Sequence, residues 1–156
     1  MADNQYNTLE TQMVTALQAD TWLGDSDNVT TIQQKISGRL EEVGEHELPL
    51  IGVMVTGGSD ELPGDETSFG AFDFTVDMVL EIVVAGADLN ALDTSAKRIV
   101  AEVRRLIREM KDSGSILSGN AQNIDNGSFE ITWFPLKQGW AVTGTTEVIV
   151  ALEEEN

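Results

Sequence analysis

The feature that most constrains the fold is a strict alternation of side chains between Phe72 and Val84. Every even position of this segment is apolar: Phe72, Phe74, Val76, Met78, Leu80, Ile82 and Val84. The odd positions include Asp73, Thr75, Asp77 and Glu81. A repeat of two residues over this length is typical of a β-strand with one buried face. The chain therefore needs other elements that cover the apolar face of a sheet.

A first helix is predicted from Asn7, which can cap it, with Glu10 three residues later as the capping-box partner. Apolar side chains then recur at helical spacing, at Leu9, Met13, Ala16 and Leu17. The polar segment 24–28 is expected to end this helix. The stripe predicts one helix face that packs on the sheet.

A second helix is predicted from Thr94 to Met110, with Asp93 as its N-cap. Its apolar stripe comprises Ala96, Ile99, Val100, Val103, Leu106, Ile107 and Met110. Basic residues form a line along one flank, at Lys97, Arg104, Arg108 and Lys111. This flank suits either a solvated helix surface or a contact between subunits.

The remaining strands are marked by shorter patterns. Residues 48–56 are expected to form a strand with Pro49 at its first positions, ended by Gly57-Gly58 and followed by a loop to Gly70. Residues 129–133 and 140–152 alternate as two further strands, the first of them stopped by Pro135. Asn126-Gly127 is typical of a type I′ hairpin turn and equally of a bulge within one longer strand.

Residues 29–43 suit both a helix and a strand, and an extended segment from Val29 to Lys35 is favoured. The order is then helix, one or two strands, long strand, helix and two strands. Connections of this length between adjacent strands favour antiparallel pairing. We therefore predict a single α+β domain over residues 1–156, with two layers: a mostly antiparallel sheet of four to five strands and two helices on one face.

Composition excludes several classes of function. The 27 acidic and nine basic residues give a net charge of −18, which argues against binding to nucleic acid or to an anionic membrane. The chain has no cysteine, and its only histidine is His46, expected in a surface loop. Neither a phosphate-binding loop nor a nucleophile motif occurs. The sequence therefore predicts a protein that is not an enzyme, with no catalytic, cofactor-binding or metal-binding residues and no membrane helix.

Four carboxylates gather in the predicted loop, at Asp60, Glu61, Asp65 and Glu66. Such a cluster could hold a hard cation weakly, and a solvated loop is the favoured interpretation. A carboxylate pair for acid–base chemistry stays open as a class, although no residue pair stands out.

The order and spacing of these elements resemble the tail terminator proteins of long-tailed bacteriophages. The resemblance covers nearly the whole chain, without a diagnostic motif. It lies in the helix 6–17, the segment 29–32, the strand that begins at Glu47-Leu48-Pro49-Leu50-Ile51, the strand 72–84 that leads into the helix 92–110, and the last strand with Val148-Ile149-Val150.

The resemblance implies a non-enzymatic virion protein. It would form a hexameric ring on the last ring of the tail tube, stop polymerisation of the tube and present a surface to the neck and head. Its partners would be other copies of itself, the tail tube protein and the neck or head-completion proteins, with DNA only passing through the ring. Its location would be the head-proximal end of the tail in the virion, and the host cytoplasm during assembly.

Within such a ring, two sets of residues are candidates for contacts. The basic flank (Lys97, Arg104, Arg108 and Lys111) is expected to meet carboxylates of a neighbour, with Asp73, Asp77 and Glu81 as candidates. The acidic loop residues are expected to meet a tail or neck partner. The alternatives are a head-closure or tail-completion protein, a small non-viral binding module working as monomer or dimer, and a carboxylate-dependent hydrolase or regulatory subunit.

Overall fold

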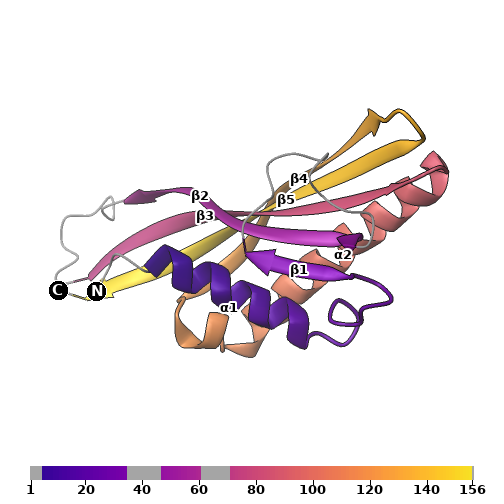
Figure 1. The fold of residues 1–156 in the computed structure, drawn as a ribbon. Helices are drawn as coiled ribbons and strands as arrows, with labels where there is room; N and C mark the ends of the chain where they lie inside the picture. Colours follow the sequence, from indigo (N-terminus) through magenta and orange to yellow (C-terminus); the bar gives the residue numbers. More distant parts are fainter. Residues whose placement is uncertain (1–4, 35–46, 61–70, 156) are drawn as a thin grey trace.

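The computed structural model describes residues 5–34, 47–60 and 71–155. Within these ranges the elements are α1 (Gln5–Ala19), β1 (Thr31–Gln34), β2 (Leu50–Asp60), β3 (Ala71–Gly86), α2 (Leu89–Ser113), the short 3₁₀ helix η4 (Leu117–Gly119), β4 (Asn123–Pro135) and β5 (Trp140–Glu155). The strands form one sheet in the order β1-β2-β3-β5-β4. Both helices lie on one side of it, α1 against β1 and β2, and α2 against β3, β5 and β4 (Figure 1). The predicted α+β fold is confirmed.

The sheet is mostly antiparallel, as predicted, with one parallel pair at its edge. Three pairs, β2–β3, β3–β5 and β5–β4, are antiparallel as expected. However, β1 runs parallel to β2, with Thr31 opposite Leu50. A parallel pair needs a connection of about a dozen residues or more, and residues 35–49 are long enough for it. The extended segment predicted from Val29 is confirmed between Thr31 and Gln34, whereas residues 35–46, including His46, lie outside the described ranges.

Strand β3 is present as the alternation predicts and runs slightly further than expected. Its even positions from Val76 to Val84 expose at most 2% of their surface, because they face the helices. The odd positions therefore face away from the helices. This alternation fixes which residues of β3 meet the core and which meet the opposite side.

Helix α1 begins at Gln5, so that Asn7 lies inside the helix and is not its cap, and it ends at Ala19, before the polar segment 24–28. The predicted stripe is confirmed, with Leu9, Met13 and Leu17 fully buried. Glu10 is not a capping-box partner: its carboxylate accepts hydrogen bonds from the backbone N–H of Val55 and from the Gln34 side chain, each at 2.7 Å. The buried carboxylate thereby fixes α1 to β1 and β2.

Strand β2 does not end at Gly57-Gly58 as predicted. A bulge between Val55 and Gly57 shifts the register, and pairing with β3 continues to Asp60. A Cβ atom on Gly58 would lie 2.5 Å from the carbonyl oxygen of Thr75, so the glycine permits the close approach of the two strands. The glycine pair therefore lies at a bulge within β2 and not at the end of the strand.

Helix α2 begins five residues earlier than predicted, at Leu89. Its N-cap is Asp88, whose carboxylate accepts hydrogen bonds from the backbone N–H groups of Asn90 and Ala91. Asp93 lies within the first turns instead. The predicted core stripe is confirmed, apart from Leu106, which is half-buried. The helix ends at Ser113, where Gly114 adopts a φ of 77° that glycine tolerates best.

Strands β4 and β5 form one long hairpin. Asn126-Gly127 is a bulge within β4, which resolves the two interpretations left open by the sequence. Residues 136–139 make the turn, with Leu136 N–H donating to the carbonyl of Gly139 at 3.0 Å. Strand β4 is the last strand of the sheet, next to α2. In the described ranges, neither helix combines the length and apolar character needed to cross a membrane.

Candidate functional site

A groove of about 380 Å³ runs between α2 and the bulged part of β4. Its lining combines cationic and apolar side chains: Lys97, Val100, Ala101, Arg104, Arg108 and Phe129. The helical repeat explains this set, because residues four and seven apart lie on one line of α2. The predicted basic flank therefore faces the edge of the sheet, and three of its four residues line one groove.

The guanidinium of Arg104 makes hydrogen bonds within its own chain. Its Nη1 donates to the carbonyl of Gly127 at 2.9 Å and to the buried hydroxyl of Thr146 at 3.2 Å. Its Cζ atom lies 5.0 Å from the ring centroid of Phe129. The bulge in β4 brings Gly127 and Phe129 to the helix, and the Asn126 amide donates to the carbonyl of Arg104 at 3.0 Å. The sequence could not show these partners, because they depend on the bulge.

The other basic residues differ in how they are paired. Lys97 forms an exposed ion pair with Asp93 at 2.7 Å. Lys111 pairs with Asp125 outside the groove. Within the described part of the chain, Arg108 has neither an ion pair nor a hydrogen bond. It is the cation of this flank that is most available to a partner.

Asp93 links the helix to the sheet edge. Its carboxylate accepts a hydrogen bond from the indole N–H of Trp133 at 3.0 Å, in addition to the ion pair with Lys97. The hydrogen bonds from Lys97 and then from Trp133 hold the pKa of Asp93 below its ordinary value. The residue predicted to cap the helix therefore orients a large aromatic side chain beside the groove.

Large apolar side chains are exposed along β4 and the turn that follows it. Phe129 and Trp133 expose 55% and 53% of their surface, and Leu136 and Phe134 also face solvent. Phe129 and Trp133 lie opposite Thr146 and Val142, which are buried on the helix side of the sheet. Alternation predicted that these positions face the helices, but it could not show that both side chains remain more than half exposed in the edge strand β4. Pro135 was the available signal for an edge strand.

Asp77 and Glu81, two of the predicted acidic partners, lie on the opposite side of the sheet. Asp77 is exposed and Glu81 is half-buried, and within the described ranges neither carboxylate has a hydrogen-bond or ion-pair partner. Burial raises the pKa of Glu81. Asp73 lies in β3 opposite Glu153. Within one chain, therefore, the basic flank does not meet the carboxylates of Asp77 and Glu81.

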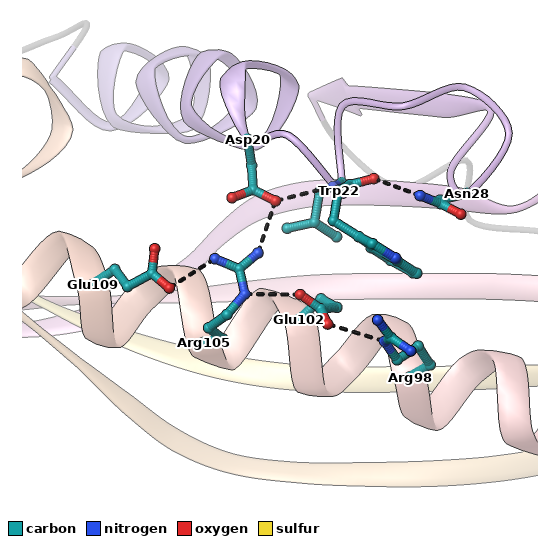
Figure 2. A network of polar contacts seen from close by, with 8 residues as sticks. Asp20, Trp22, Asn28, Arg98, Glu102, Arg105 and Glu109 are labelled. Carbon is teal, nitrogen blue, oxygen red and sulfur yellow. Dashed lines mark hydrogen bonds and ion pairs between the residues drawn. The ribbon is translucent and has the colours of Figure 1, made fainter.

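A second charged cluster lies on the other flank of α2 (Figure 2). Arg105 binds three carboxylates: Asp20 and Glu102 at 2.8 Å and Glu109 at 2.9 Å. Arg98 pairs with Glu102 and lies 4.8 Å from the ring centroid of Trp22. These contacts attach the segment after α1 to α2. The cluster therefore holds the segment after α1 against α2 and differs in role from the groove.

The acidic loop is described only at its start. Asp60 is the last residue of β2, and the other candidates, Glu61, Asp65 and Glu66, lie outside the described ranges. Among the residues that the structure describes, no group of three or more acidic or histidine side chains is arranged to hold a metal ion. Comparison of the chain with protein-family models and with curated proteins gives no match.

Proposed function

We propose that this protein is a structural component of a long-tailed phage virion. It forms a hexameric ring on the end of the tail tube, stops polymerisation of the tube and provides the surface to which the neck and head attach. The proposal combines the resemblance in element order with one structural observation, the surface of exposed apolar and basic side chains along α2 and β4. No catalytic step is part of the proposed role.

The composition of that surface supports an assembly role. Phe129 and Trp133 each expose more than half of their surface beside a groove that holds two arginines. Aromatic residues and arginine are the side chains most enriched at the energetic centres of protein interfaces. Strand β4 also has a free edge in the described sheet, and protein assembly often covers such an edge.

The charge distribution supports contacts between copies of an acidic protein. Subunits with a net charge of −18 repel one another, so their association needs local groups of opposite sign. Six of the nine basic residues of the chain lie between Lys97 and Lys111 on α2. The rest of the chain is acidic and repels phosphate. This property suits a ring through which DNA moves without being retained.

The test is polymerisation of the tail tube protein of the same phage with and without this protein. We expect shorter tubes, each closed at one end by a ring in negative-stain images. The variant Phe129→Ser/Trp133→Ser is expected to leave tube length uncontrolled, whereas Tyr6→Ser is expected to act as the wild type. Tyr6 is a matched control because it exposes 48% of its surface on α1, away from the groove.

Other outcomes of the tube-polymerisation experiment would indicate other classes of protein. A protein that stays a monomer or dimer and leaves tube length unchanged would contradict the proposal and favour a small binding module. A protein that binds heads but not tail tubes would indicate a head-closure role. Melting temperatures of both variants within a few degrees of the wild type would show that any loss of capping arises at the surface.

A further inference from the structure

The groove between α2 and β4 holds more positive charge than its own chain neutralises. Arg108 has no partner among the described residues, and Lys97 has one exposed ion pair. Arg104 is a partly exposed residue, and its Cζ atom lies 5.0 Å from the ring centroid of Phe129. Because the groove is also lined by Val100 and Phe129, its chemistry favours an occupant that is both acidic and apolar.

The opposite side of the sheet has that chemistry. Asp77 and Glu81 of β3 and Glu147 of β5 alternate with buried core residues, so they face away from the helices. Ile149, 38% exposed, and the half-buried Val79 lie among them. The side chains of Asp77 and Glu81 have no partner in the described ranges. This surface, the open face, is an acidic patch with an apolar centre.

The charged residues of the groove and those of the open face also span similar distances. Lys97 and Arg108 are eleven positions apart in α2, which is about 16 Å along a helix. Asp77 and Glu81 are four positions apart in β3, which is about 13 Å along a strand. We propose that the groove of one copy binds the open face of β3 and β5 on a second copy, with the exposed ring of Phe129 against its apolar centre. This inference rests on the proposed ring.

The contact is head-to-tail, because groove and open face lie on opposite sides of the sheet of one chain. Each copy then uses its groove toward one neighbour and its open face toward the other. Contacts of this type repeat and close into rings or continue as filaments, whereas a two-fold contact ends at a dimer. A second copy is favoured over a foreign acidic protein because one chain carries both halves of the contact.

Two variants test the groove and the open face separately. Arg108→Glu changes the groove, and Asp77→Asn/Glu81→Gln changes the open face. Neither is expected to impair folding, since Arg108 and Asp77 are exposed and glutamine removes the half-buried charge at Glu81. We expect each variant alone to need a concentration about tenfold higher or more for assembly, as measured by sedimentation velocity. Lys137→Glu, which changes the net charge as Arg108→Glu does but lies outside the groove, is expected to assemble as the wild type.

The decisive measurement is native mass spectrometry of the two variants mixed in equal amounts. One intact groove and one intact open face remain in the mixture, so we expect a one-to-one complex that does not grow into a ring. Rings from both variants at wild-type concentrations would overturn this inference and leave the proposed function standing. A mixture that remains monomeric would also overturn it. A wild-type protein that stays monomeric even beside tail tubes would overturn both.

Discussion

Arg105 of α2 and Asp20, which directly follows α1, form an ion pair of 2.8 Å across 85 positions of sequence. The Asp20 side chain is only 9% exposed and also accepts a hydrogen bond from the backbone N–H of Leu23 at 3.0 Å. This pair attaches the segment that follows α1 to α2. It fixes the segment that leads from α1 into β1, and therefore the position of one edge of the sheet.

Replacement of Arg105 should destabilise the fold. Arg105→Met leaves the nearly buried carboxylate of Asp20 without its cation and should lower the free energy of unfolding by about 1–3 kcal/mol. Arg98→Met is the matched control: Arg98 is 57% exposed with one ion pair, to Glu102, so its loss should cost no more than about 1 kcal/mol. Urea denaturation of both variants measures the difference, and equal losses would contradict a special role for Arg105.

The same cluster predicts how stability depends on pH. Burial alone would raise the pKa of Asp20, but the hydrogen bonds from Leu23 and Arg105 hold it below its ordinary value of 3.8. Hydrogen bonds from Arg105 and Arg98 outweigh the smaller effect of burial and likewise lower the pKa of Glu102 from 4.5. As pH falls, the unfolded carboxyls bind protons first, so this stability is present above about pH 4.5 and is lost below it.

Thermal unfolding between pH 7 and pH 2.5 tests this prediction. The melting temperature of the wild type should fall as pH drops below the ordinary pKa values of the two carboxyls. Arg105→Met should show a shallower fall, because its Asp20 and Glu102 lack the cation that lowers their pKa. If the melting temperatures of the two proteins fall equally as pH drops, the acid sensitivity arises from other carboxyl groups.

The register of β3 predicts opposite tolerance at neighbouring positions. Val76 is 1% exposed and faces the helices, whereas Thr75 faces the other side and is half-buried. Val76→Asp buries a carboxylate without a partner and should cost about 3–5 kcal/mol, while Thr75→Asp should cost about 1 kcal/mol or less. Differential scanning fluorimetry suffices to compare them. Similar shifts in melting temperature would mean that the faces of β3 are assigned incorrectly.

Periodicity in the sequence predicted the elements that bury one continuous stripe. The alternation around Val76 and the helical repeat through Val103 each specify one buried face, and both are confirmed. Helix starts were less predictable, since Asp88 and Asp93 are equally suitable caps by residue type, and only packing of the first turn distinguishes them. The parallel pairing of β1 depends on a connection whose path no local pattern encodes.

The candidate site was predictable only in part. The helical spacing of Lys97, Arg104 and Arg108 indicated one basic line, and the structure places all three in one groove. The partners of Arg104 could not be predicted, because the bulge after Asn126 brings the Gly127 carbonyl to it. The exposure of Phe129 depends on the strand order, which leaves β4 at the edge.

Gly144 of β5 sets how closely α2 packs on the sheet. A Cβ atom at this position would lie 2.8 Å from Cγ2 of Val100 and 3.2 Å from Cδ1 of Ile131. Gly144→Ala should therefore push α2 away from the sheet and cost about 1–3 kcal/mol through overpacking. Because Val100 also lines the groove, the same change should weaken assembly of the ring.

The double variant Gly144→Ala/Val100→Ala tests whether this contact is the cause. Val100→Ala alone should be destabilising by about 1–2 kcal/mol, because it removes buried methyl groups. If the new methyl group at position 144 takes the space vacated by Val100, the double variant should lose less stability than the two single changes added together. Denaturant unfolding of all four proteins gives the coupling energy. Strict additivity would show that α2 does not approach β5 through Gly144.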